Sequence, residues 1–141
     1  MGIYETIISR RTIRKFKQEK IDIKILKKIV NAGRLAPSAA NLQPLEYLIV
    51  DDEDLKNKVF PDLAWAGYIK PAWAPSKEER PTAYVVILVN DIDDRYHVRD
   101  VGLATGNIVL AAEAENIGSC ILCNIKKDEI RKVLRIPDTL Y

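Results

Sequence analysis

The chain has 141 residues, of which 48% are apolar and 30% charged, and its formal net charge is +2. This composition excludes a disordered chain, and the length allows a single domain over residues 1–141 with a core of its own. No apolar run is long enough to span a membrane, and the N-terminus has no signal-peptide pattern. Two cysteines three positions apart and one histidine predict neither a disulfide framework nor a metal site. We therefore expect a cytoplasmic protein.

The charges are unevenly distributed along the chain. Residues 1–28 carry nine lysines and arginines against three acids, whereas residues 46–62 carry six acids against two lysines. On a nearly neutral protein, such a basic segment favours a local anion site over a broad nucleic-acid surface. A nucleic-acid module would also need stacking aromatic residues beside the basic ones, and only Phe16 is available.

The first half of the chain predicts three helices and one strand. Helices are expected over residues 3–9 and from the capping residue Asp22 to a stop before Pro37. A short apolar strand over 47–50 and a helix over 53–60 follow. Residues 61–82 contain four prolines, which predicts a long irregular loop, and loops of this length commonly cover a site or an interface. Its aromatic residues either pack the loop onto the domain or form the wall of a substrate site: Trp65, Tyr68 and Trp73.

The second half predicts a central strand over 83–89, apolar on both faces, and then a long helix over 98–116. His97 is expected near the start of this helix, and Gly118 is placed to end it. Residues 119–123 are expected to form a third buried strand, and Asp128 to cap a last helix that runs to 134. This order of elements predicts an α+β fold in three layers, with helices on both faces of a small mixed sheet.

Two polar stretches have no obvious structural purpose. Residues 9–16 (SRRTIRKF) supply four cations, and an extended backbone would send Arg10, Thr12 and Arg14 to one side. Residues 36–44 (APSAANLQP) are uncharged, are framed by prolines and offer Ser, Asn and Gln side chains at short spacing. Taken alone, each stretch is also compatible with a solvated turn. No glycine-rich phosphate loop is present, so an anionic cofactor would have to be held by cationic side chains.

These two stretches, together with RPTAY over 80–84, the helix start at 100–107, GSC over 118–120 and VLRIP over 133–137, resemble the nitroreductase-like family of FMN-dependent oxidoreductases. The resemblance runs in order along nearly the whole chain. It implies the family's fold and a homodimer with FMN at the subunit interface. It also implies a ping-pong reaction that transfers electrons from NAD(P)H to nitroaromatic, quinone or similar planar acceptors.

The resemblance also assigns the cofactor-binding residues, and it assigns no catalytic side chain because the flavin carries the chemistry. Arg10 and Arg11 match the residues that hold the FMN phosphate and ribityl chain, and Thr12 stands at the family's serine position. Arg14 matches the cation near the N1–C2 edge of the ring. The remaining matches line the flavin: Pro37, Ser38, Ala39, Asn41 and Gln43 from the neighbouring subunit, and Leu122, Cys123 and Asn124 near N5.

Three other interpretations stay open at this stage. Family members continue past the Ile136-Pro137 turn into a further strand and a basic tail, and this C-terminal segment is expected to be missing here. An FMN-binding protein with little or no turnover is therefore one alternative, and a specialised flavin reductase or dehalogenase is another. A dithiol centre at Cys120 and Cys123 is disfavoured, because a strand would point residues i and i+3 to opposite faces.

Overall fold

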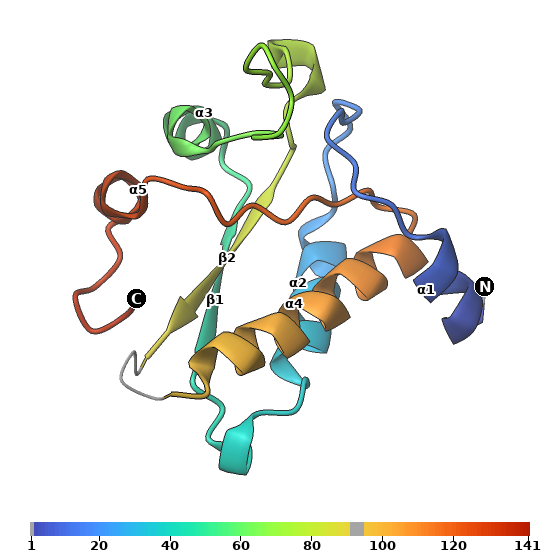
Figure 1. The fold of residues 1–141 in the computed structure, drawn as a ribbon, viewed down its shortest axis with the longest axis vertical. Helices are drawn as coiled ribbons and strands as arrows, with labels where there is room; N and C mark the ends of the chain where they lie inside the picture. Colours follow the sequence, from blue (N-terminus) through green and yellow to red (C-terminus); the bar gives the residue numbers. More distant parts are fainter. Residues whose placement is uncertain (1, 91–94) are drawn as a thin grey trace.

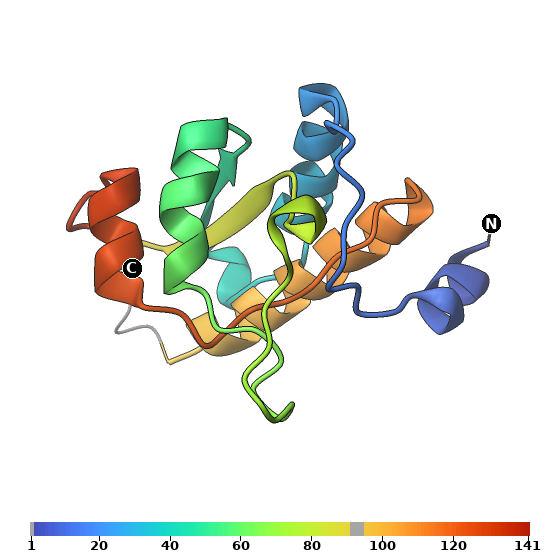
Figure 2. The same ribbon diagram turned by 90° about the horizontal axis from the view of Figure 1, so that it is seen from above.

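The structure is a computed structural model that describes residues 2–90 and 95–141. The helices and strands form three layers, with α2 and α4 on one face of a sheet and α3 and α5 on the other (Figures 1 and 2). The predicted fold class is thereby confirmed. The elements are α1 (Ile3–Ser9), α2 (Ile23–Arg34), β1 (Leu45–Val50), α3 (Glu53–Val59), β2 (Tyr84–Val89), α4 (His97–Ala114) and α5 (Lys127–Leu134).

The packing of α2 on α4 provides the main core. Ile29 of α2 and Ile108 and Ala112 of α4 are buried together. Side chains of both strands pack against this cluster, Tyr47 from β1 and Val85 and Ile87 from β2. The two helices come close at Gly33, where a Cβ atom would lie only 2.7 Å from the side chain of Ile108. A larger residue at this crossing would force the side chain of Ile108 to move.

The sheet is antiparallel and not mixed as predicted: in the described part of the chain it consists of β1 and β2, with Leu45 opposite Val89 and Val50 opposite Tyr84. On the other edge of β2, Val89 exchanges two backbone hydrogen bonds with Tyr141, with N···O distances of 2.7 and 2.9 Å. Exchange of both bonds is the pattern of a hydrogen-bonded antiparallel pair. The strand predicted as central thus has β1 on one edge and Tyr141 on the other.

The predicted third strand over 119–123 is wrong. This segment crosses the two strands instead of lying along either (Figure 1). Only isolated bridges are formed near it, a parallel one between Thr12 and Ser119 and an antiparallel one between Leu63 and Ile125. An apolar run forms a strand only when another segment pairs with it along its length. Here other segments of the same chain form bridges only near its two ends.

Helix ends follow the predictions where the signal is local. Asp22 and Asp52 cap α2 and α3 by accepting bonds from the amides of Lys24 and Leu55. Asp128 does not cap α5, because the helix has already begun at Lys127 and the capping position belongs to Lys126.

Gly118 does not end α4 either, because the left-handed residue after this helix is Asn116, with φ 58°. The glycine has another purpose. A Cβ atom at Gly118 would lie 2.9 Å from Ile13, so the absence of a side chain lets the N-terminal arm, residues 10–18, come close to Gly118.

No helix in the described part of the chain is long and apolar enough to cross a membrane.

Candidate functional site

The basic arm over residues 10–18 is held in an extended conformation by backbone hydrogen bonds to two other segments of the chain. Ile13 donates its amide to the carbonyl of Ser119 at 2.9 Å, and Phe16 donates to the carbonyl of Glu79 at 3.0 Å. The Lys15 ammonium lies 2.8 Å from the Glu79 carboxylate. This contact lowers the pKa of Glu79, because the hydrogen bond from Lys15 favours its charged form. The arm is thereby tied to the end of the 61–82 loop.

The three arginines predicted to hold FMN differ in their surroundings. Arg11 turns back and donates to the carbonyls of Ile8, Ser9 and Arg10 at 2.8–3.3 Å, so it caps the C-terminus of α1. The guanidinium groups of Arg10 and Arg14 form no hydrogen bond or ion pair with any other described residue. Unlike Arg11, these two cations are available to a ligand.

The 119–126 segment lies beside the arm and presents unpaired backbone amides. Its far end is fixed by bonds from Ala64 to the carbonyl of Asn124 and from Lys126 to the carbonyl of Asp62. Between these contacts and Ser119, the amides of Leu122, Cys123 and Asn124 donate to no acceptor among the described residues. Such a row of donors could bind a polarised ring edge, and the role predicted for these residues stays a prediction.

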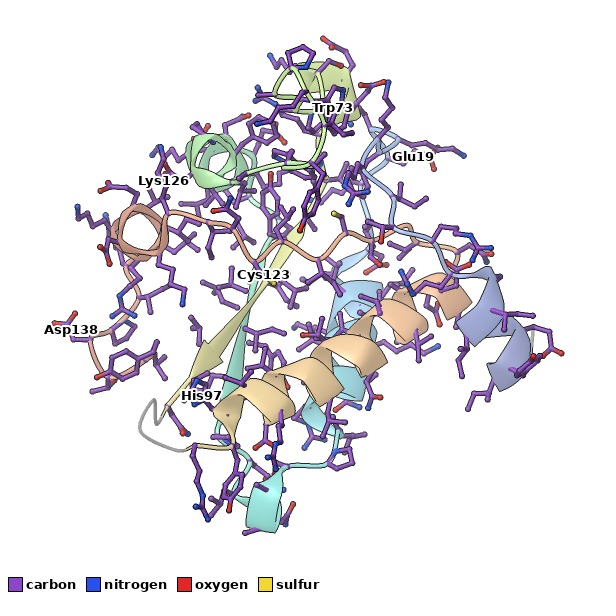
Figure 3. The ribbon with its side chains drawn as sticks, viewed as in Figure 1. Glu19, Trp73, His97, Cys123, Lys126 and Asp138 are labelled. Carbon is purple, nitrogen blue, oxygen red and sulfur yellow. The ribbon has the colours of Figure 1, made fainter. Side chains whose placement is uncertain are left out.

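The two cysteines are free thiols, with Cys120 half-buried and Cys123 exposed. Burial raises the pKa of Cys120, and the charge of nearby Arg14 opposes this shift. Arg14 therefore lies close enough to the 119–126 segment for its charge to be felt there. Figure 3 places Cys123 within this segment, where it crosses the strands.

The aromatic residues of the 61–82 loop differ in their burial and in their contacts. Trp65 is buried and packs against Phe60, with ring centroids 5.9 Å apart, so it fastens the loop to the domain. Tyr68 is fully exposed. Trp73 and Ile69 instead border a shallow, mostly apolar hollow of about 450 Å³, whose other side is formed by residues 12–15. Trp73 is therefore placed as the prediction of a substrate wall requires, beside Arg14.

The second predicted stretch forms a strained turn. Three non-glycine residues adopt left-handed backbone angles: Ala40 (φ 48°), Asn41 (φ 56°) and Gln43 (φ 52°). Each such residue costs roughly 1–3 kcal/mol, which contacts with the surrounding structure must offset. Within the turn, Gln43 donates its amide to the Ser38 hydroxyl at 3.0 Å and its side chain to Asn41 at 3.1 Å.

Sequence reasoning missed the residue that holds this turn from outside. Asp100, in the first turn of α4, is 2% exposed and is the one fully buried charged side chain among the described residues. Its carboxylate oxygens lie 3.1 and 3.3 Å from the amide nitrogen of Ala39. An acidic residue in the first turn of a helix is common for electrostatic reasons, so its position in the sequence does not indicate that this one is buried.

The two groups of predicted residues lie at opposite ends of α4. The turn contacts the helix at Asp100, whereas Ser9, just before the arm, lies 3.2 Å from the carboxylate of Glu113. The thirteen-residue separation corresponds to about 20 Å along a helix. Figure 3 shows the same division, with His97 at one end of the molecule and Trp73 and Glu19 at the other. A single chain therefore brings the arm and the 119–126 segment together but leaves the 37–43 turn apart.

Comparison with known proteins gives one family throughout. The model of the nitroreductase family matches residues 7–141. A protein of Archaeoglobus fulgidus named "Putative NADH dehydrogenase/NAD(P)H nitroreductase" is 30% identical, over 95% of this chain and 76% of its own. An iodotyrosine deiodinase of Thermotoga neapolitana is 27% identical over 98% and 82%. The crystal structure of a nitroreductase family protein from Clostridium novyi is 26% identical, covers 99% and 79%, and superposes with a TM-score of 0.81.

Proposed function

Because the chain belongs to the nitroreductase family, we propose that it is an FMN-dependent oxidoreductase that works as a homodimer. The electron donor is NAD(P)H, and the acceptors are planar electrophiles such as nitroaromatics or quinones. The names of relatives support the donor, and solved neighbours of the same fold in complex with FMN support the cofactor. One observation carries the proposal. The guanidinium groups of Arg10 and Arg14 bind no described residue, and the segment beside their arm contains backbone amides, those of residues 122–124, that have no acceptor among the described residues.

The residues present suit FMN. Arg10 and Arg14 supply cations that form no ion pair with another described residue. Arg10 suits the FMN phosphate, which needs such a donor where no glycine-rich loop exists, and Arg14 suits the N1–C2 edge of the ring. The amides of residues 122–124 supply donors for the polar edge of the ring, and Trp73 and Ile69 supply an apolar wall. When bound, FMN provides the redox chemistry, accepting a hydride from NAD(P)H and passing the electrons to the acceptor. The chain binds, orients and shields it.

A dimer explains why the predicted residues are divided between the two ends of α4. If two copies pack with their α4 helices antiparallel across a two-fold axis, the 37–43 turn of one copy meets the arm of the other. The outer face of α4 suits this contact. Val98 and Leu103 are 69% and 48% exposed, and a Cβ atom added to Gly102 or Gly106 would meet nothing within 4 Å. Both FMN sites would then be built from two chains.

Reductive dehalogenation is a second candidate for the same site. It is favoured by relatives named iodotyrosine deiodinase, one of which matches over 98% of this chain. The two functions share the cofactor and differ in the acceptor. Iodide release from 3-iodotyrosine, compared with the loss of a nitroaromatic under the same conditions, distinguishes them.

The purified protein should be yellow and should lose its colour when NADH or NADPH is added without oxygen. Restoration of the colour by a quinone or a nitroaromatic would complete the cycle. Absorbance spectra of the protein and of its heat-released cofactor provide the measurement. A colourless protein whose melting temperature FMN does not raise would contradict the proposal.

Arg10→Ala should weaken FMN binding about ten- to hundredfold, because a charge-assisted contact to phosphate is worth roughly 1.5–3 kcal/mol. Arg11→Ala should also weaken binding, but it removes the α1 cap as well, so only Arg10 gives a clean test. Lys24→Ala, which removes an exposed cation from α2, is the matched control and should bind as the parent does. Equal FMN dissociation constants for Arg10→Ala and Lys24→Ala, measured by fluorescence quenching, would remove Arg10 from the site.

A further inference from the structure

We propose that Asp100 is a positioning residue that holds the 37–43 turn in its ligand-binding conformation by capping it from α4. This inference rests on the proposed function, because the turn is expected to line FMN. Asp100 itself does not touch the cofactor.

The short 3₁₀ helix Ala39–Asn41 is capped from outside. Ser38 stands at its N-cap position but forms no side-chain bond to the first amides of the helix. The acceptor for the amide of Ala39 is instead the Asp100 carboxylate, at 3.1 and 3.3 Å. A cap supplied by another element fixes the position of the turn relative to α4, which a cap supplied by Ser38 would not do.

This arrangement leaves the donors of the turn available. The Ser38 hydroxyl accepts from Gln43, and its own hydrogen has no acceptor among the described residues. The Asn41 side chain likewise accepts from Gln43 through Oδ1, while its NH₂ group donates to no described residue. Both groups are therefore free to bind a ligand as donors, provided that the strained turn keeps its shape. A buried carboxylate is costly unless it is hydrogen-bonded, so Asp100 and the turn stabilise each other.

Asp100→Ala should weaken FMN binding about tenfold and accelerate hydrogen exchange at the Ala39 amide in the protein without FMN. Asp100→Asn keeps an oxygen acceptor at the same place and should recover most of both properties. Asn107→Ala is the matched control. It removes a bond of 3.0 Å to the carbonyl of Ala32, made about 10 Å along the same helix from Asp100, and should change stability without changing FMN affinity beyond about twofold.

The unsubstituted protein offers a measurement that does not depend on any variant's folding. The amide of Ala39 should exchange more slowly than that of Ala40, which donates to no described acceptor. Equal exchange rates at the two amides, or an unchanged FMN affinity in Asp100→Ala, would overturn the inference. Failure of the unsubstituted protein to bind FMN would contradict the proposed function instead, while the exchange data would still decide whether Asp100 holds the turn.

Discussion

Gly106→Leu should convert a dimeric, FMN-containing protein into a monomer without flavin. Within one chain the new side chain has room, since a Cβ at Gly106 meets nothing within 4 Å. Across a two-fold axis, however, both copies would carry the leucine at the contact between helices. Overpacking costs roughly 1–3 kcal/mol for each inserted side chain, so two of them should weaken the dimer at least about thirtyfold.

The monomer itself should not lose stability, because leucine is a better helix former than glycine by somewhat less than about 1 kcal/mol. This sets the expected result apart from simple unfolding. Light scattering across a concentration series gives the mass, and visible absorbance of the same fractions gives the flavin content. Lys27→Leu adds the same side chain to an exposed position of α2 and should stay dimeric and yellow. A Gly106→Leu monomer that keeps its flavin would contradict a site shared between chains.

Most elements of this fold could be predicted because their signals are local. Asp22 and Asp52 cap their helices within three residues, and the apolar spacing of α2 lies within one helix. The third strand could not be predicted in this way, because a strand depends on a partner distant in the sequence. The residues at 119–123 have a composition typical of strands, yet the arm and residues 62–64 contact only the ends of this segment.

The candidate site was predictable to a similar extent. The basic arm and the 36–44 turn stand out in the sequence because their polar residues do not contribute to an apolar core. The arm does lie beside the start of the 119–126 segment, through the bridge between Thr12 and Ser119. The sequence could not indicate which polar side chains are buried, or which cations already bind carbonyl groups of the chain itself. Asp100 is buried where α4 contacts the turn, and Arg11 already donates to carbonyls at the end of α1.

Arg14→Gln should lower the midpoint potential of bound FMN by about 20–45 mV while leaving the affinity for oxidised FMN nearly unchanged. Arg14 borders the hollow beside Trp73, and its charge reaches Cys120 of the adjacent segment. A cation at the N1–C2 edge meets negative charge mainly after reduction, so only the reduced state loses stabilisation. A partly buried charge-assisted contact is worth roughly 1–2 kcal/mol, and 30 mV corresponds to about 1.4 kcal/mol for two electrons.

The neighbouring residue provides a matched control for charge. Lys15→Gln also removes one positive charge from the arm, but the Lys15 ammonium is already paired with Glu79 at 2.8 Å. Loss of the Lys15 charge should change the midpoint potential of bound FMN by no more than a few millivolts, because solvent and Glu79 screen this charge from the ring. Potentiometric titration of the three proteins, with NADH reduction rates alongside, separates the two effects. Equal shifts in both variants would indicate a general effect of net charge, and an unshifted Arg14→Gln would place this arginine away from the flavin ring.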